Sequence, residues 1–331
     1  MKIMVYEARP DERADLEKQA ELHGVELSVT DAVPTLENAS LAAGCIGVSI
    51  LGQGCIDAAL LDAYHALGIR YLSTRTIGYD HIDLDHARSI GLRVCSASYA
   101  PNGVADFTVM MILMCLRHYK QALWRGQVND FSLTGLQGRE MKDLTIGIIG
   151  TGRIGAQVAR NLSGFGCRIL AYDLRHNPAV EPQVTYVDFD TLLAQSDVIT
   201  LHMPLLDSNR HIINRESVAK MRDGVVIVNC SRGELADIEA LIEGIETGKI
   251  GALGMDTVEG DEGIIHADHR VDILPNRNWF YLHQFRNVIM TQHMAFYTDA
   301  AVSSMVDCGI GGICQMAAGE SCPTELTGPV Q

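Results

Sequence analysis

A short, largely apolar segment that leads directly into a glycine-rich turn constrains the fold of this chain more than any other feature. Residues 144–149 have the composition of a buried strand, and Gly150, Gly152 and Gly155 follow them in the spacing GxGxxG. In such a turn the first glycine permits a tight bend, the second lets a pyrophosphate approach the backbone, and the third lets a helix pack closely on the strand. The N-terminus of that helix faces the phosphates. The pattern therefore predicts a Rossmann-type dinucleotide site.

An acid at the end of the next predicted strand indicates which dinucleotide binds. Residues 167–172 form a second apolar run, and Asp173 follows it eighteen residues after Gly155. A carboxylate at this position accepts hydrogen bonds from the ribose hydroxyls of adenosine and repels a 2′-phosphate. NAD is therefore the expected cofactor rather than NADP. Arg175 is the one nearby residue that could soften this preference.

Charge and composition limit the partners of the chain. A formal net charge of −15 argues against nucleic acid, whose phosphates are neutralised by Lys and Arg, and against an anionic membrane surface. The most apolar stretch, residues 109–116, is shorter than the ~20 residues of a membrane span and predicts a buried helix. The N-terminal residues already form a strand pattern with no leader, and nine scattered cysteines include no CxxC pair. We expect reduced thiols and a cytoplasmic protein.

Strand and helix patterns alternate along the chain in two series. The first predicts strands at 3–6, 25–29, 46–51, 71–74 and 94–96, and helices at 11–23, 56–67 and 101–118. The second predicts strands at 145–149, 168–172, 198–201, 225–229, 252–255 and 288–291, and helices at 154–162, 189–195, 216–221 and 238–247. A last helix is expected from 299 to about 309, with a surface tail at 317–331. The predicted class is α/β with two doubly wound domains, with the ligand in a cleft between them.

Three predicted loops at strand ends carry polar residues suited to chemistry. Arg232 follows strand 225–229, four acids lie within residues 256–262, and His293 follows the last strand. Each has an ordinary structural alternative, namely a helix-capping arginine, a solvated acidic loop and a structural histidine. Together they match the needs of 2-oxo acid reduction: a cation for the carboxylate, a proton donor, and a carboxylate that holds this donor protonated.

Several motifs resemble those of one enzyme family over essentially the whole chain. They are the 150–155 turn with Asp173, residues 202–204, residues 221–233, residues 248–251 and residues 291–293. On these motifs the chain resembles the D-isomer-specific 2-hydroxyacid dehydrogenases. Residues 74–83, 99–102 and 293–298 narrow the resemblance to the subset that contains D-lactate, D-phenyllactate and (R)-2-hydroxyglutarate dehydrogenases.

The resemblance implies a role for individual positions. Arg232 would bind the carboxylate and carbonyl of a 2-oxo acid, and His293 would donate the proton. The residues beside the substrate would be Ile77 and Gly78 through their backbone, Tyr99, Arg232 and Phe296. The NAD site would be lined by Gly150, Gly152, Arg153, Ile154, Gly155, Asp173, His202, Met203, Pro204, Asn209, Cys230, Ser231, Arg232, Asp256 and His293.

The resemblance also implies an interrupted domain order. A flavodoxin-like substrate domain would comprise residues 1–100 and 298–331, with a Rossmann NAD-binding domain, residues 101–297, inserted between them. Residues 119–139 are similar to the arm through which relatives form homodimers, so we expect a homodimer.

The chain departs from the family at one catalytic position. Counted from Arg232, the catalytic glutamate of the family falls on Asp261, with Glu262 directly after it. Aspartate is one methylene shorter, so either the loop restores its reach to His293 or Glu262 takes the role. His266 and His269 resemble a ligand pair, but without a second pair we expect a solvated loop and no metal.

Two functions remain open from the sequence alone. The first is an NAD-dependent D-2-hydroxyacid dehydrogenase that reduces a 2-oxo acid with an apolar side chain, such as phenylpyruvate, 2-oxoisocaproate or pyruvate, because Leu51 and Gly52 offer no cation for a distal carboxylate. The alternative is an NADH-sensing binding protein or corepressor of the same fold. The acidic net charge and the absence of a basic extension favour the enzyme.

Overall fold

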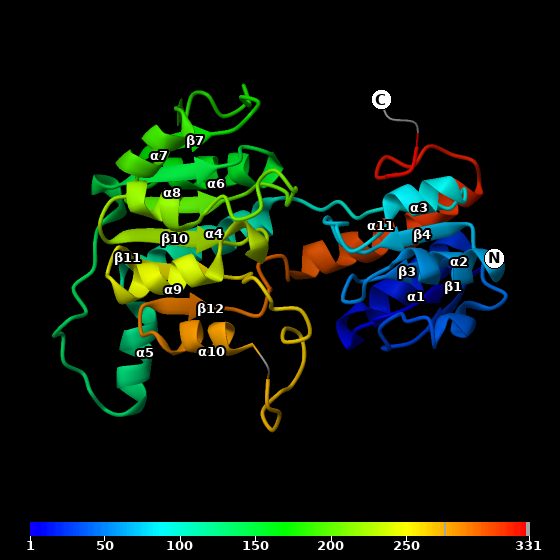
Figure 1. Ribbon diagram of the computed structural model, residues 1–331. Helices are drawn as coiled ribbons and strands as arrows, with labels where there is room; N and C mark the ends of the chain where they lie inside the picture. The colour runs from blue at the N-terminus through cyan, green and yellow to red at the C-terminus, as the bar shows by residue number, and fades with distance from the viewer. Residues whose placement is uncertain (275, 329–331) are drawn as a thin grey trace. The chain divides into compact units, whose positions relative to one another are not determined.

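The computed structural model describes residues 1–274 and 276–328, which divide into two compact units (Figure 1). The first unit comprises Met1–Ala100 and the segment from Tyr297 onward, and the second comprises Pro101–Phe296. Each unit is built around one parallel sheet, which confirms the predicted α/β class.

The first unit contains a five-stranded sheet in the flavodoxin-like order β2-β1-β3-β4-β5. Its strands are β1 (Lys2–Val5), β2 (Glu26–Val29), β3 (Gly47–Ile50), β4 (Tyr71–Thr74) and β5 (Arg93–Cys95). Its α-helices are α1 (Arg13–His23), α2 (Ala58–Ala66), α3 (Leu84–Ser89) and α11 (Asp299–Ala317). Because side chains alternate along a strand, Met4 packs on the face covered by α2, whereas Ile3 and Val5 pack on the face covered by α1 and α11.

The second unit contains a seven-stranded sheet in the order β12-β11-β10-β9-β6-β7-β8, which is the Rossmann order with an added edge strand. Its strands are β6 (Thr145–Ile149), β7 (Arg168–Tyr172), β8 (Thr185–Tyr186), β9 (Val198–Leu201), β10 (Val225–Asn229), β11 (Ile250–Met255) and β12 (Val288–Met290). Its α-helices are α4 (Asn102–Leu116), α5 (Tyr119–Gln127), α6 (Arg153–Ser163), α7 (Phe189–Gln195), α8 (Arg215–Lys220), α9 (Ile238–Glu246) and α10 (Arg277–Gln284). Short 3-10 helices lie at Pro10–Glu12, Ala39–Ala42, Met141–Asp143 and Gly233–Leu235.

The long helix α11 corrects the prediction of a helix that ends near residue 309. The helix continues to Ala317, with Gly309 and Gly312 inside it. A Cβ atom at Gly309 would lie 2.8 Å from Cγ of Arg75, and one at Gly312 would lie 2.7 Å from Sγ of Cys95. These glycines therefore allow close packing of the helix rather than ending it. Among the described helices, α11 is long and apolar enough for a membrane span, and its apolar residues pack in the core with α1.

The described part of the C-terminal tail is also not the surface extension that we predicted. The Ser96 amide donates a hydrogen bond to the Thr324 carbonyl (3.0 Å), and the Leu326 amide donates to the Val94 carbonyl (2.8 Å). Arg93 forms an ion pair with Glu325 at 2.7 Å. The tail therefore extends the edge of the sheet beside β5.

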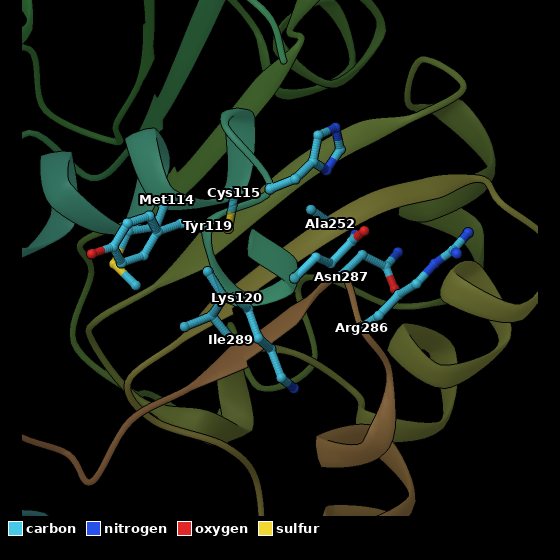
Figure 2. Close-up of a pocket in the computed structure, with 10 residues that line it drawn as sticks. Met114, Cys115, Tyr119, Lys120, Ala252, Arg286, Asn287 and Ile289 are labelled. Carbon is cyan, nitrogen blue, oxygen red and sulfur yellow. The ribbon is translucent and has the colours of Figure 1, made fainter. Parts of the chain in front are cut away.

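Helix α5 was not predicted as a separate element, and a lysine anchors it to the second unit. Lys120 Nζ donates hydrogen bonds to the carbonyls of His283 (2.9 Å), Phe285 (3.0 Å) and Val288 (2.7 Å), and burial lowers its pKa. A cavity of about 10 Å³ beside it is lined by Lys120 and Asn287 among others (Figure 2). Such a cavity has room for one water and not for a substrate.

Candidate active site

The turn between β6 and α6 requires glycine at two of its three predicted positions. Gly150 has a φ of +92°, and a Cβ atom there would lie 2.7 Å from the His202 carbonyl oxygen. At Gly155 a Cβ atom would lie 1.9 Å from the carbonyl oxygen of Gly150. A side chain at Gly150 would therefore collide with the loop after β9, and one at Gly155 would push α6 away from the turn.

The space beside Gly152 suits the pyrophosphate of a dinucleotide. A Cβ atom at Gly152 would meet no atom within 4 Å, and no side chain caps the N-terminus of α6 at this residue. Arg153 and Ile154 form the first turn of the helix, where backbone N–H groups and the helix dipole favour an anion. The turn therefore fits the cofactor that the sequence predicts.

Asp173 lies directly after β7 and is fixed against the glycine-rich turn. Its Oδ2 accepts hydrogen bonds from the Thr151 amide (2.6 Å) and the Thr151 hydroxyl (3.1 Å), and its Oδ1 accepts one from the Arg175 amide (3.0 Å). The Tyr186 hydroxyl donates to Thr151 Oγ1 at 2.8 Å. Thr151 is thus a positioning residue that our reading of the motif missed, although it lies between the first two glycines.

The loop after β9 carries four residues predicted for the cofactor site, namely His202, Met203, Pro204 and Asn209. Burial lowers the pKa of His202 to about 3, so its ring is neutral, and its Nε2 lies 2.9 Å from the Thr200 hydroxyl. The Asn209 amide donates to the Pro204 carbonyl at 2.8 Å. These contacts give the loop a fixed shape at the carboxyl edge of the sheet.

The loop after β10 presents Arg232. The buried Asn229 side chain donates to the Arg232 carbonyl (2.7 Å) and accepts from the Ser231 amide (3.0 Å). The Ser231 hydroxyl donates to the Met203 carbonyl at 2.6 Å, which joins this loop to the one after β9. Arg232 itself is half-buried, and its Nη1 donates to the Ser231 carbonyl at 3.0 Å. Cys230 lies directly before Ser231. Its thiol is buried, and burial raises its pKa.

Asp256, at the end of β11, holds the loop that carries His293. Its carboxylate is 1% exposed and accepts three hydrogen bonds from that loop. The donors are the Thr291 hydroxyl (2.6 Å), the Met294 amide (2.9 Å) and the Ala295 amide (2.8 Å). The two donating amides directly follow His293, so Asp256 sets the position of its backbone.

The two candidate acids of the next loop lie in different environments. Asp261 is half-buried, and its Oδ2 accepts a hydrogen bond from the Val258 amide at 3.1 Å. Burial raises the pKa of Asp261 to about 6, and the nearby carboxylates of Glu262 and Glu234 raise it as well. Glu262 is exposed. A carboxyl group that titrates close to neutrality is typical of catalytic sites, which favours Asp261.

His293 adopts a left-handed backbone conformation, with a φ of +51°, in the loop after β12. The centroid of its ring lies 6.4 Å from the ring centroid of Phe296 and 6.2 Å from that of His266. Nε2 of His266 lies 3.2 Å from the His293 carbonyl oxygen. From the sequence we expected His266 in a solvated loop; its side chain is exposed, and it also lies beside the predicted proton donor. Among the described residues, no group of three or more His, Cys, Asp or Glu side chains is placed to hold a metal ion.

The second unit brings its predicted catalytic residues to one edge of the sheet. β10, β11 and β12 are adjacent parallel strands, and the loops after them carry Arg232, Asp261 and His293. The glycine-rich turn follows β6 in the same sheet, and parallel strands end at the same edge. The cofactor and catalytic positions therefore share that edge.

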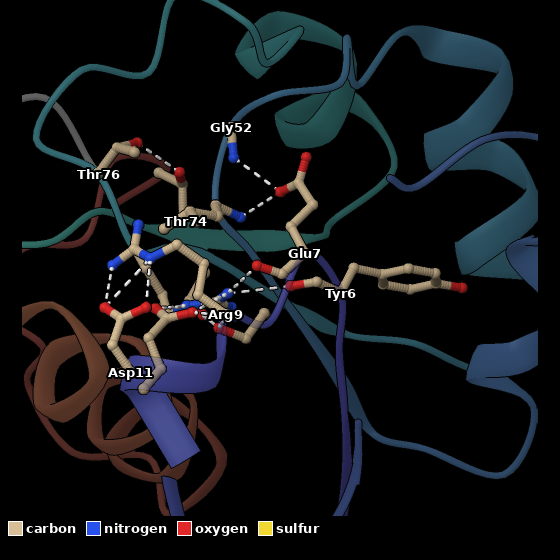
Figure 3. A network of polar contacts seen from close by, with 12 residues as sticks. Tyr6, Glu7, Arg9, Asp11, Gly52, Thr74 and Thr76 are labelled. Atoms are coloured by element: carbon tan, nitrogen blue, oxygen red, sulfur yellow. Dashed lines mark hydrogen bonds and ion pairs between the residues drawn. The ribbon is translucent and has the colours of Figure 1, made fainter. Parts of the chain in front are cut away.

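The first unit places its predicted substrate residues in the loops after β4 and β5. Ile77 is 36% exposed, and the Thr76 hydroxyl donates to the Gly78 carbonyl at 2.7 Å. The Ala97 amide donates to the Thr76 carbonyl at 2.9 Å, which ties the two loops together ahead of the half-buried Tyr99. Figure 3 shows Thr76 next to Thr74, whose hydroxyl lies 2.6 Å from its own.

Comparison with known proteins identifies the family. Residues 109–295 match the family model of the D-isomer specific 2-hydroxyacid dehydrogenase, NAD binding domain. An aromatic 2-oxoacid reductase of Clostridium sporogenes is 42% identical over 93% of this chain and 93% of its own length. The D-lactate dehydrogenase of Escherichia coli is 37% identical over 98% of this chain and 100% of its own.

A solved structure extends this similarity to the fold and the cofactor. The NAD-complexed D-isomer specific 2-hydroxyacid dehydrogenase of Lactobacillus delbrueckii ssp. bulgaricus has a TM-score of 0.82 at 30% identity, over 98% of this chain and 100% of its own. The glycine-rich turn, Asp173 and the three predicted catalytic loops agree with this similarity. The chain belongs to the D-isomer-specific 2-hydroxyacid dehydrogenase family and is an NAD-dependent oxidoreductase of 2-oxo acids.

Proposed function

We propose that the enzyme reduces 2-oxo acids with apolar side chains to (R)-2-hydroxy acids, with Arg232, Asp261 and His293 as its catalytic residues. The observation that carries this proposal is the placement of these three residues after adjacent strands, at the edge that also holds the glycine-rich turn. Bound NADH supplies the hydride to the carbonyl carbon, and the residues of the chain supply orientation and the proton.

Arg232 binds the substrate and polarises it. Its guanidinium forms paired hydrogen bonds with the substrate carboxylate and draws electron density toward the carbonyl oxygen. The contacts of Asn229 and Ser231 fix the backbone from which the arginine extends. This arrangement is consistent with a bidentate grip that sets the face of the carbonyl carbon.

His293 donates a proton to the oxygen as the carbonyl is reduced. Asp261 accepts a hydrogen bond from the imidazole and holds it protonated near neutral pH. The raised pKa of Asp261 places its titration inside the working range of such a pair. Glu262 is exposed and is the weaker candidate for this role.

We assign the remaining substrate-binding residues to the loops of the first unit and to Phe296, and cofactor binding to the second unit. The backbone of Ile77 and Gly78 holds the substrate carboxylate, and Tyr99 and Phe296 lie beside the substrate. The predicted NAD residues lie in the first turn of α6 and in the loops after β6, β7, β9, β10, β11 and β12, which supports the second assignment.

The substrate side chain is apolar in this proposal. Residues 51–54, in the loop after β3, carry no basic side chain that could pair with a distal carboxylate. Leu51 is 6% exposed, and a Cβ atom at Gly52 would lie 3.0 Å from the His81 ring, so neither residue adds a polar group beside this loop. The similarity to the aromatic 2-oxoacid reductase supports the same substrate class.

A panel of 2-oxo acids tests the proposal. The oxidation of NADH is followed at the nicotinamide absorbance band with phenylpyruvate, 2-oxoisocaproate, pyruvate and 2-oxoglutarate. We expect the highest kcat/KM for phenylpyruvate or 2-oxoisocaproate, a lower value for pyruvate and a poor one for 2-oxoglutarate. A higher kcat/KM for 2-oxoglutarate than for phenylpyruvate and pyruvate would overturn the substrate class.

We further propose a cytoplasmic homodimer. Helix α5 has no buried residue, and an apolar set on it and after it is exposed, namely Leu123, Trp124, Val128, Phe131 and Leu133. Exposed apolar patches of this kind are typical of subunit interfaces. Sedimentation of the parent and of a Trp124→Glu variant checks this: the parent sediments as a dimer and the variant as a monomer.

A further inference from the structure

A buried carboxylate in the first unit is bound by four consecutive backbone amides. Glu7 lies two residues after the end of β1 and is 3% exposed. Its Oε2 accepts hydrogen bonds from the amides of Leu51 and Gly52 (2.8 Å to Gly52), and its Oε1 accepts from those of Gln53 (2.9 Å) and Gly54 (3.1 Å). Figure 3 shows the carboxylate beside Gly52.

Such a set of converging amides is an anion-binding nest, and here a side chain of the same protein fills it. Glu7 reaches the nest from a left-handed backbone conformation with a φ of +55°, which is uncommon for a residue other than glycine. Its amide donates to the Ala32 carbonyl (3.1 Å), and its carbonyl accepts from Nη2 of Arg75 (3.3 Å). These bonds hold the backbone in the conformation that directs the carboxylate into the loop.

Arg75 is itself held rigidly. It is fully buried, and its Nε forms an ion pair with the buried Glu12 at 3.0 Å. It also donates to the Tyr6 carbonyl at 3.0 Å, next to Glu7. The ends of β1 and β4 are thereby joined, and this network fixes the position of Glu7.

The nest lies beside the proposed substrate residues. A Cβ atom at Gly52 would lie 3.4 Å from Cγ2 of Thr76, so the loop after β3 contacts the loop after β4. Thr76 in turn donates to the Gly78 carbonyl at 2.7 Å. The loop that holds Glu7 is therefore adjacent to the backbone that grips the substrate carboxylate in the proposed function.

We infer that Glu7 is a specificity-determining residue, which occupies the amide nest of residues 51–54 and thereby excludes 2-oxo acids with a second carboxylate. This inference rests on the proposed function, because it needs the loops after β3 and β4 to face the substrate. A distal carboxylate approaching the loop finds its amides already bonded and meets a like charge. An apolar side chain needs no hydrogen bond from these amides and is not repelled by the carboxylate of Glu7, so it is accepted.

The test compares kcat/KM for 2-oxoglutarate and phenylpyruvate in the parent, in Glu7→Ala and in Glu7→Gln. We expect the kcat/KM for 2-oxoglutarate, divided by that for phenylpyruvate, to rise at least tenfold in Glu7→Ala because the KM for 2-oxoglutarate falls. The rise should be smaller in Glu7→Gln, because the side-chain oxygen of Gln still accepts hydrogen bonds from some of the four amides. Glu26→Ala removes an equal charge from an exposed position of the same unit and should leave the ratio unchanged. NADH affinity, measured by fluorescence, should be unchanged in all variants.

Added acetate gives a second, independent readout. In Glu7→Ala, acetate should bind in the nest and lower the kcat/KM ratio toward the parent value. The parent enzyme, measured at the same acetate concentrations, shows how much acetate changes the ratio when the nest is already filled. A ratio within twofold of the parent in the folded variants overturns the inference and leaves the proposed function standing. If Glu7→Ala does not fold, the ratio in Glu7→Gln decides. A parent that itself prefers 2-oxoglutarate overturns the proposed substrate class together with this inference.

Discussion

Gly233 lies so close to the backbone of Val258 that a Cβ atom at position 233 would sit 2.3 Å from the Val258 carbonyl carbon. The loops that carry Arg232 and Asp261 therefore pack backbone to backbone. No side chain fits between them, and the separation of the guanidinium and the carboxylate depends on that contact.

A methyl group at Gly233 should move the two loops apart. Because a displacement of about 1 Å in a catalytic group can cost on the order of 100-fold in rate, we expect Gly233→Ala to lower kcat/KM by at least tenfold. Gly164→Ala is the matched control, since a Cβ atom there would meet only the Asn161 carbonyl oxygen, at an ordinary contact distance of 3.7 Å. Steady-state kinetics of both variants checks this, and equal activities would show that the contact is not needed.

Replacing His293 with Gln should remove the proton donor and retain NADH binding. General acid catalysis is worth about 10²–10⁴-fold, so kcat for reduction should fall by at least the lower figure. Stopped-flow or steady-state rates at neutral pH measure the loss, and fluorescence titration measures NADH affinity. Turnover within a few-fold of the parent would rule out His293 as the acid.

The two acids after Val258 can be separated by their effect on the pH profile. We expect Asp261→Asn to cost more activity than Glu262→Gln, and to shift the pH optimum of reduction downward, because His293 without its carboxylate loses its proton at lower pH. Rates measured across pH 5 to 9 for both variants decide the question. A larger loss in Glu262→Gln would move the role to Glu262.

Asp261 also affects folding stability: its replacement by Asn, which should lower activity, should make the folded protein more stable near neutral pH. Its pKa is about 6 in the folded protein against an ordinary value of 3.8, so between these values the folded protein holds a proton that the unfolded chain has released. Stability from this group therefore falls as pH rises through that range. Asp261→Asn should equal the parent at pH 3 and exceed it above pH 6 by on the order of 1 kcal/mol, after allowance for solvent screening. Urea unfolding at both pH values measures the difference.

His266 should act on the reaction through His293. The contact between its Nε2 and the His293 carbonyl stabilises a left-handed backbone, so we expect His266→Phe to lower kcat several-fold and His266→Gln, which keeps a donor, to lose less. In a His293→Gln background, His266→Phe should have no further effect. An equal loss in both backgrounds would show that His266 acts independently of the proton donor.

The sequence predicts the buried parts of this fold well. β6, β7, β9 and β10 have the predicted bounds, because strands buried on both faces are continuous apolar runs. The loops after these strands could also be predicted, because each apolar run ends at a polar segment. α5 was missed because none of its residues packs in the core of the unit, and the sequence predicted only an arm over residues 119–139.

What the sequence could not reveal are contacts between distant residues. Glu7 and Gly54 are separated by 47 positions, and Asp256 and Ala295 by 39. An acid after a strand has the same local pattern whether it binds a cofactor, a proton donor or a nest of amides. Only the folded chain shows which of these partners each acid has.

Helix α11 also determines the order in which the protein can be completed during synthesis. It packs against α1 and closes one face of the sheet formed by the first 100 residues, although it follows the whole NAD-binding unit in the chain. The NAD-binding unit is one continuous segment that ends at Phe296, so all of its residues are available before α11 is made. Because contiguous domains fold as they emerge, the part of the protein that is translated first acquires its complete core last.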